Sequence, residues 1–217
     1  RLDATLKPAA PEAGNLAHWS GTVELQGING SALRLRLFDL RRDASNYLLY
    51  FTRPVREQST RPDLLPELRQ FAGVFVGNGA SHLYLQGALG QPLFRGGNGI
   101  AERRYLETVY LNQQQLWAAT RWAMQRLPWD LLLTYTPYPD EAEHLWRGFL
   151  EPELRGFRPE LADRLRPFLE EVYRSADAFL GMLMQLRSEE TVIALVSDDG
   201  IEGVNQAVRV NAVLQHA

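Results

Sequence analysis

Two long stretches in the second half of the chain repeat their apolar residues at the period of an α-helix. Between residues 103 and 127 apolar side chains recur at three- or four-residue intervals, and the same spacing runs from 160 to 187. The spacing predicts two long amphipathic helices, because residues three and four apart lie on one helical face. Pro128 ends the first helix, and Pro167 either kinks the second or divides it.

The first half is rich in short segments in which apolar and polar residues alternate. Residues 22–26 and 33–37 alternate on either side of a Gly-containing turn, which predicts a hairpin with one solvent-facing side. Residues 47–51 are a further strand. The other predicted elements are a short helix over 62–71 and strands over 73–79 and 82–86.

A glycine-rich turn separates the two patterns. Gly96, Gly97 and Gly99 interrupt the chain where the period changes from that of strands to that of helices. We therefore predict two domains: a β-rich lobe over residues 1–98, inserted into the core or capping it, and a core over residues 99–217.

Two short apolar runs, 131–136 and 191–196, each follow one of the predicted long helices. Each run predicts a buried strand, because a strand covered on both faces is apolar without alternation. The order helix, strand, helix, strand, without short hairpins, indicates parallel strands joined by right-handed crossovers. The predicted fold class is therefore α/β, a partial core of parallel strands with flanking helices, together with the β-rich N-terminal lobe.

An acidic motif follows the first of these strands. Asp140 and His144 are four residues apart, so both side chains point the same way if this loop turns helically, and they can then share one cation. In an open α/β sheet, ligand and metal sites lie at the carboxyl ends of the strands. The alternative is structural: Asp140 caps a helix and His144 lies in its next turn.

A second acidic motif follows the second strand. Asp198 and Asp199 are adjacent carboxylates, which repel each other unless a positive charge lies beside them. A metal ion is one such charge. The alternative is a turn in which Asp198 bonds to the backbone and Asp199 points to water.

Composition narrows the possible functions. The chain has 217 residues, a net charge of −3 and no cysteine. The charge provides no basic field for a nucleic-acid polymer, and the absence of cysteine excludes disulfides and thiolate metal sites. The sequence contains no apolar run approaching the ~20 residues that span a bilayer. Residue 1 is Arg and no signal-peptide pattern follows, which suggests a piece of a longer protein.

The order of these features resembles the type I phosphodiesterase/nucleotide pyrophosphatase family of the alkaline phosphatase superfamily. That family has an apolar strand, a turn with Tyr and Pro, and Asp-x-x-x-His, as in residues 131–144 here. A helix with Asp and Gly follows, as in 172–181, then a hydrophobic strand and Ser-Asp-His-Gly-Met, matched by 197–201. Residues 208–214 resemble the stretch that leads to another strand. The resemblance covers roughly residues 104–217 and implies an alkaline-phosphatase-like core.

By this resemblance, Asp140 and His144 would hold one divalent ion, and Asp198 and Asp199 a second. Zn²⁺ is the first expectation. However, the family has His where this chain has Asp199, and an oxygen ligand shifts the preference toward Mn²⁺ or Mg²⁺. The resemblance places the Thr or Ser nucleophile and further ligands outside this chain, so no catalytic nucleophile is assigned within it.

Two functions follow from the resemblance. The first is a fragment of a metal-dependent phosphodiesterase or phosphatase-like hydrolase that acts on small phosphate esters and needs the remainder of its parent chain. Such a fragment is expected to be inactive alone. The second is a non-catalytic module for substrate capture or protein contact on a degenerate core, and Asp199 favours it.

Overall fold

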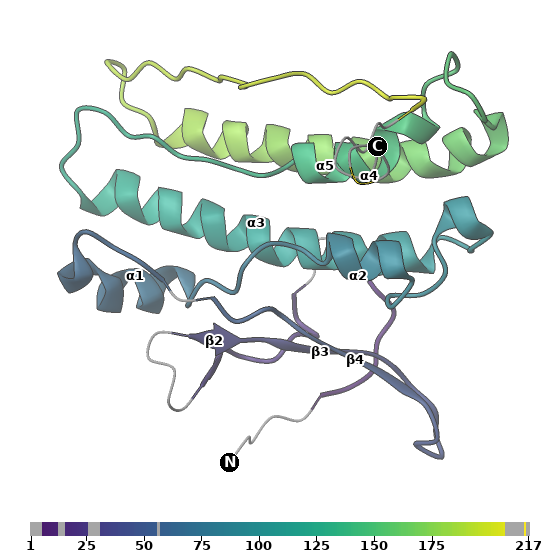
Figure 1. Ribbon diagram of the computed structural model, residues 1–217. Coiled ribbons are helices and arrows are strands. Elements are labelled where there is room, and N and C mark those ends of the chain that lie inside the picture. The colour runs from purple at the N-terminus through teal and green to yellow at the C-terminus, as the bar shows by residue number, and fades with distance from the viewer. Residues whose placement is uncertain (1–5, 13–15, 26–30, 56, 207–214, 216–217) are drawn as a thin grey trace.

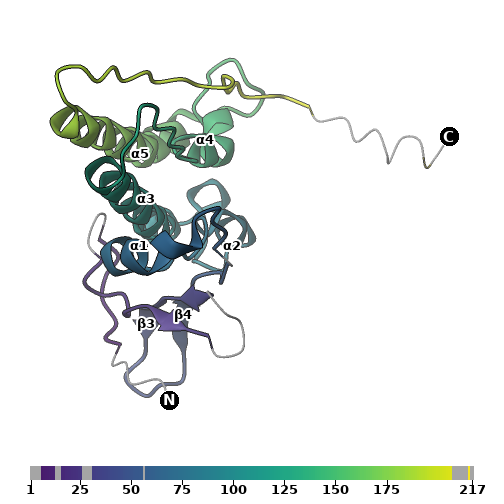
Figure 2. The ribbon, with the colours of Figure 1, turned by 90° about the vertical axis from the view of Figure 1, so that its left-hand side faces the viewer.

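The computed structural model describes residues 6–12, 16–25, 31–55, 57–206 and 215. Figure 1 shows successive layers, with the strands on one side, then α1 and α2, then α3, and then α4 and α5. Figure 2 confirms that α3 lies in the middle. The helices are α1 (Leu65–Ala72), α2 (Ser81–Gln86), α3 (Ile100–Arg126), α4 (Asp140–Trp146) and α5 (Pro159–Leu186), with short 3₁₀ turns at Pro62–Leu64, Leu93–Arg95 and Arg147–Phe149.

The described strands form two small antiparallel hairpins. β1 (Val23–Glu24) pairs with β2 (Ala32–Leu33), and β3 (Leu35–Leu40) pairs with β4 (Tyr47–Phe51). This confirms the predicted hairpin after residue 22 and the strand at 47–51. The fold therefore mixes helices with strands, as predicted, but the sheets that the described residues form are antiparallel.

The two long helices confirm the helical periodicity of the sequence. α3 and α5 begin and end within a few residues of the predicted limits. Pro159 begins α5, where a fixed φ and a missing N–H cost nothing, whereas Pro167 lies inside the helix without ending it. Trp117 of α3 stacks on Phe179 of α5 with ring centroids 5.6 Å apart, so the two long helices pack against each other there.

The central helix α3 holds the extended segment 74–80 through side chains rather than through a sheet. Gln115 donates to the carbonyl of Val74 at 2.7 Å and accepts from the amide of Val76 at 3.3 Å. One and two turns further toward the N-terminus of α3, Asn112 donates to the carbonyl of Gly77 and Thr108 accepts from the amide of Ala80. The prediction of a strand over 73–79 is therefore wrong, because helix side chains take the place of a neighbouring strand.

The predicted strand at 82–86 is also wrong, since these residues belong to α2. A short apolar run does not distinguish a strand from a helix by itself. Here Tyr84 is fully buried, and its hydroxyl donates to Glu102 of α3 at 2.7 Å. Gly87 ends the helix in the left-handed conformation, with a φ of 80°.

A buried ion pair joins the strand layer to α3. Arg36 of β3 donates to Glu107 through Nε at 2.5 Å, and both residues are completely buried. Arg36 also donates to the backbone carbonyls of Ala9 and Leu37. These extra bonds matter because a buried charge is tolerated only where its hydrogen-bonding groups are satisfied.

The predicted parallel strands at 131–136 and 191–196 are not strands in this structure. Both segments are extended, and they lack a strand partner among the described residues. Six of their large apolar side chains are 72% to 89% exposed, namely Leu131, Leu133, Tyr135, Val192, Leu195 and Val196. Leu132 and Ile193 are half-buried. An apolar run becomes a strand only where a neighbouring strand supplies backbone hydrogen bonds. Apolar composition alone therefore predicted two strands that the described residues do not form. The stretch 208–214 lies outside the described residues.

One hydrophobic core crosses the position of the predicted domain boundary. It includes Trp19 and Phe38 from the strand layer, Tyr105 from α3, and Trp146 and Leu165 from α4 and α5. Gly99 directly precedes α3 with a φ of 97°. The division into a lobe over 1–98 and a core over 99–217 remains a prediction.

The bonds from Gln115 predict a stability effect. Replacing Gln115 with Ala leaves the carbonyl of Val74 and the amide of Val76 without their partner, which costs about 1–3 kcal/mol for each buried group left unsatisfied. We expect Gln115→Ala to lower the free energy of unfolding in urea by at least that amount. Gln125→Ala, on the exposed side of the same helix, is the matched control. Equal stability of the two variants would contradict the role assigned to Gln115.

Candidate functional site

Helix α4 brings the first predicted ligand pair together. Asp140 occupies its first turn and His144 the next, and Oδ1 of Asp140 lies 3.4 Å from Nε2 of His144. Both side chains reach solvent, at 48% and 69% exposure. The condition for a shared cation, that this loop turns helically, is therefore met. The capping alternative is not confirmed, since Pro139 precedes the helix and, within the described residues, no side chain caps its N-terminus.

Buried contacts fix the position of α4. Ala142, Leu145 and Trp146 face the core, and Nε1 of Trp146 donates to the Tyr84 hydroxyl at 3.0 Å. That hydroxyl in turn donates to Glu102, so a series of hydrogen bonds runs from α4 through α2 to α3. Burial raises the pKa of Tyr84, which keeps the hydroxyl protonated and able to donate.

Two residues beside the ligand pair were not predicted from the sequence. Glu141 accepts from Nδ2 of Asn78 at 2.7 Å, and Tyr138 accepts from the amide of Gly79 at 3.0 Å. Both bonds connect α4, or the residues just before it, to the segment 74–80 that α3 holds. Burial raises the pKa of the Glu141 carboxyl, and the bond from Asn78 partly offsets that effect. For Glu141, the only sequence signal was its place among the carboxylates of Asp140–Glu143. That signal does not reveal Asn78, a partner some sixty residues away.

The structure does not bring the second predicted pair to the first. Asp198 and Asp199 are exposed on the extended segment after α5, where the Ser197 hydroxyl donates to the carbonyl of Asp199 at 2.6 Å. Within the described part of the chain, no three His, Asp or Glu side chains are grouped so that they could hold a metal ion. The roles of all four residues as ligands remain a prediction.

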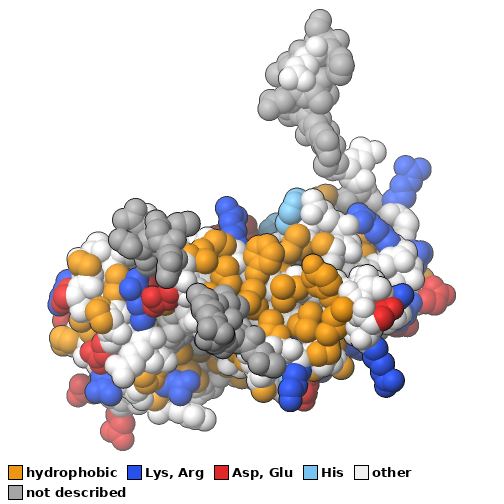
Figure 3. All heavy atoms as spheres, turned by 90° about the horizontal axis from the view of Figure 1, so that it is seen from below, with side chains coloured by type: hydrophobic (Ala, Val, Ile, Leu, Met, Phe, Trp, Pro, Cys, Tyr) orange, Lys and Arg blue, Asp and Glu red, His pale blue; other side chains and the backbone are white. Residues whose placement is uncertain are grey.

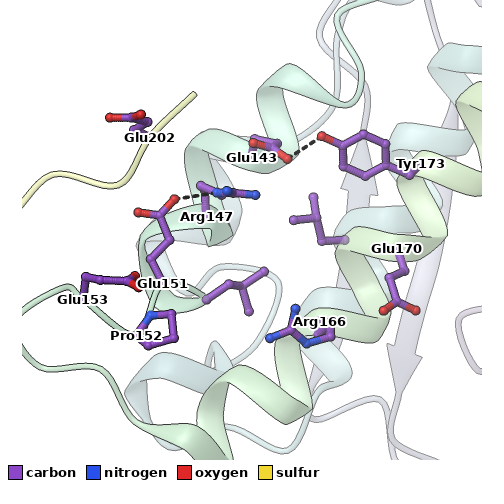
Figure 4. Close-up of a pocket in the computed structure, with 11 residues that line it drawn as sticks. Glu143, Arg147, Glu151, Pro152, Glu153, Arg166, Glu170, Tyr173 and Glu202 are labelled. Carbon is purple, nitrogen blue, oxygen red and sulfur yellow. Dashed lines mark hydrogen bonds and ion pairs between the residues drawn. The ribbon is translucent and has the colours of Figure 1, made fainter. Parts of the chain in front are cut away.

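A polar pocket of about 570 Å³ lies between α4, the loop at 151–153 and α5. Figure 4 shows its charged residues around a central space. Five carboxylates and two guanidinium groups line it, above an apolar floor that includes Leu150 and Leu169. The charged residues are Glu143, Glu151, Glu153, Glu170, Glu202, Arg147 and Arg166.

The pocket begins on the same helix as the candidate ligands. Glu143 is three residues after Asp140 on α4, and Arg147, three residues after His144, begins the 3₁₀ turn that continues from this helix. Tyr173 of α5 donates to Glu143 at 2.5 Å (Figure 4). Partial burial, together with this bond, raises the pKa of Tyr173 to about 12, so it is a hydrogen-bond donor at neutral pH.

The segment after Asp199 is hydrogen-bonded to the rim of this pocket. Glu151 accepts from Arg147 at 2.6 Å and from the amide of Gly203 at 3.0 Å. A Cβ at position 203 would meet Cδ1 of Leu154 and would lie 2.7 Å from Oε2 of Glu151 and 3.1 Å from Cα of Gly148, so a larger residue there would displace its neighbours. This close approach places Glu202 over the pocket (Figure 4).

These features define a mixed helix–strand protein with an exposed Asp–His pair, the candidate metal ligands, next to a polar pocket. A sequence comparison identifies the family: the model of the type I phosphodiesterase / nucleotide pyrophosphatase family matches residues 80–217. Because this match covers well over half of the chain, the protein belongs to that family, as the sequence motifs predicted. Comparison with curated proteins and with solved structures gave no match.

Family membership establishes part of the predicted function. The family consists of phosphate-ester hydrolases that generally depend on metal ions, and it suggests small phosphate esters as substrates. The match begins at residue 80, so it includes α2, which the sequence analysis assigned to the N-terminal lobe. Among the described residues, no helix is both long and apolar enough to cross a membrane.

The buried environment of Glu141 predicts a pH-dependent stability change. A carboxyl whose pKa is raised by folding stabilises the protein while protonated, and this stabilisation is lost as the pH rises through the raised pKa. Glu141→Gln keeps an acceptor for Asn78 and removes the charge. We therefore expect its melting temperature to exceed that of the parent by a few degrees at pH 8. The two should converge near pH 4, below the ordinary pKa of about 4.3.

Thermal unfolding at a series of pH values measures this difference. The control is Glu153→Gln, which removes a carboxylate that is exposed to solvent. A lower melting temperature for Glu141→Gln at pH 8 would mean that the ionised carboxylate stabilises the fold, contrary to the burial effect.

Proposed function

We propose that this chain forms part of the active site of a metal-dependent phosphate-ester hydrolase, with Asp140 and His144 as ligands of one divalent ion. The observation that carries the proposal is their convergence on α4, inside the region that matches the family. Asp198 and Asp199 are proposed as ligands of a second ion. Two such ions supply a clamp for the attacking and leaving oxygens of phosphoryl transfer and lower the pKa of the nucleophile.

The spacing of Asp140 and His144 fits a shared metal ion. Zn²⁺ binds carboxylate oxygen and imidazole nitrogen at about 2.0–2.2 Å in a tetrahedral arrangement, so two ligands on one ion lie roughly 3.3–3.5 Å apart. The observed 3.4 Å lies within that range, and both side chains are accessible to solvent. A direct contact between the two side chains gives the same distance, and metal titration distinguishes the two arrangements.

The described residues supply only part of the ligand set. Two donors are fewer than the three or four protein ligands that Zn²⁺ takes, and Asp198 and Asp199 are not grouped with them. The exposed apolar segments 131–136 and 191–196 support the same conclusion, because a sheet core would need to cover them. We therefore propose that the remaining ligands, the nucleophile and the neighbouring strands come from outside the described residues.

The pocket beside α4 is proposed to receive the part of the substrate that is not phosphate. Five carboxylates against two guanidinium groups make it a poor place for an anion. Its apolar floor and the Tyr173 hydroxyl suit a group that is neutral or positively charged. The phosphate itself would then lie toward the Asp140 end of the helix, so one helix would supply both metal ligands and substrate contacts.

The second candidate function is a non-catalytic module for substrate capture or protein contact. The observation that favours it is Asp199, which stands exposed where the family has histidine. An aspartate there can still bind Mn²⁺ or Mg²⁺, which prefer oxygen ligands. Loss of metal binding, rather than a changed metal preference, would therefore favour the non-catalytic module.

Metal titration tests the proposed ligand pair. Under the hydrolase proposal, calorimetry with Zn²⁺ and Mn²⁺ on the full-length parent should detect binding, and Asp140→Ala should weaken it about tenfold or more, because one of two converging donors is lost. Asp163→Ala removes an exposed carboxylate on α5 and should leave binding unchanged. Equal metal binding by both variants would contradict the assignment of Asp140, and no binding at all would favour the non-catalytic module.

Turnover tests whether the described residues suffice for catalysis. We expect the 217-residue chain to hydrolyse a nitrophenyl phosphodiester with negligible metal-dependent activity, because the described ligand set is incomplete. The measurement is release of nitrophenolate with Zn²⁺ or Mn²⁺, compared with metal removed by a chelator. Metal-dependent rates typical of intact enzymes, about 1 s⁻¹ or faster, would overturn the proposal that other ligands are needed.

A further inference from the structure

The β3–β4 hairpin carries apolar residues on both faces, although only one face packs against the core. Arg36, Phe38 and Tyr50 point inward and are buried. The outward face consists of three apolar cross-strand pairs, in which Leu35 faces Phe51, Leu37 faces Leu49 and Leu40 faces Tyr47. Tyr47 and Phe51 are 63% and 60% exposed. Figure 3, seen from the side of the strand layer, shows hydrophobic side chains gathered into a patch.

The outer edge of β4 is open as well. Among the described residues, β3 is the only strand that pairs with β4. The amide of Thr52 donates to the carbonyl of Arg34 at 3.0 Å, which marks this position as a hydrogen-bonded pair. Because such pairs alternate along antiparallel strands, the backbone N–H and C=O groups of Leu49 and Phe51 face away from β3.

Nothing in the sequence of β4 protects this edge. Natural proteins shield exposed edge strands with charges, prolines or bulges that prevent pairing with another chain. The strand reads Tyr-Leu-Leu-Tyr-Phe and has neither a charge nor a proline, and the irregularity of the hairpin lies between Leu37 and Asp39 on β3. The edge is therefore suited to receive another strand.

We propose that β4 pairs antiparallel with β4 of a second copy of this chain, about a two-fold axis through Leu49. In this register Leu49 faces Leu49 of the second copy, and Tyr47 faces Phe51 on both sides of the axis. The same backbone groups that point away from β3 then form the new hydrogen bonds. The two hairpins become one four-stranded sheet with a continuous apolar outer face.

The pattern of β4 favours a second copy over an unrelated partner. A two-fold interface must be complementary to itself, and β4 has an aromatic residue at each end and leucine at its centre. Aromatic residues placed opposite each other across strands stabilise a sheet. At about 200 Å² for each aromatic residue, Tyr47 and Phe51 together expose roughly 250 Å². This is well under the ~800 Å² per partner of a standard interface, so the dimer is weak and reversible.

Cysteine cross-linking tests the register directly, since the chain has no cysteine of its own. Residues paired across the axis have Cα atoms about 5.5 Å apart, within the range of a disulfide. Under mild oxidation of the 217-residue chain, Leu49→Cys should give at least about tenfold more disulfide dimer than Leu85→Cys. Leu85 is an equally accessible control on α2, 42% exposed against 40% for Leu49. Equal cross-linking of the two variants would overturn the proposal.

Mixed variants distinguish edge pairing from stacking of the outer faces. Tyr47→Cys and Phe51→Cys should cross-link efficiently when mixed. Each variant alone should cross-link poorly. In a dimer of one variant, the two cysteines lie four residues apart along the paired strands, a separation of about 13 Å. Efficient cross-linking of either variant alone would contradict this register.

The oligomeric state provides an independent measurement. Sedimentation velocity should show a monomer–dimer equilibrium, and Leu49→Arg should weaken it about tenfold or more by placing like charges opposite each other on the axis. Leu85→Arg should leave the equilibrium unchanged, and circular dichroism confirms that both variants fold. A chain that is monomeric at the highest soluble concentration, or equal weakening by both variants, would overturn the proposal.

Discussion

The structure depends on polar side chains that α3 buries among its neighbours. A helix surrounded on several sides would ordinarily be apolar, but Gln115, Asn112 and Thr108 project from α3 and bond the backbone of 74–80. The extended segment thereby has its backbone groups satisfied without a sheet, which is a requirement for any buried chain. Because the same helix also bonds Arg36 through Glu107, the strand layer and the segment 74–80 share one support.

That support also determines where the candidate ligands lie. Glu102 accepts from Tyr84, and Tyr84 accepts from Trp146, so a continuous line of buried bonds runs from α3 to α4. The bond from Asn78 to Glu141 adds a second connection, one residue from Asp140. A change on α3 is therefore expected to reach the ligand pair through α4, although α3 contributes no ligand itself.

The sequence predicted the long helices well and the strands poorly, for physical reasons. Helical periodicity is a local property, and over more than twenty residues it identified α3 and α5 despite Pro167. A strand depends on a partner, and the partner of 74–80 proved to be a helix, while 131–136 and 191–196 have none among the described residues. The Asp140–His144 spacing was predictable because it lies within a single helix. Asn78 and Glu141 were not, since their contact depends on how α3 positions both segments.

The two acidic motifs differ in how firmly the structure holds them, and this difference bears on chemistry. Asp140 and His144 belong to a helix anchored by Trp146, so their backbone positions are set before any ion binds. Asp198 and Asp199 lie on an extended segment that is fastened further along, where Glu151 bonds to Gly203. Binding at a preformed pair costs little ordering, whereas a ligand on an extended segment must be ordered by the ion itself. Under the proposed function, the first pair would therefore define the position of the metal centre, and Asp199 would determine whether a second ion binds.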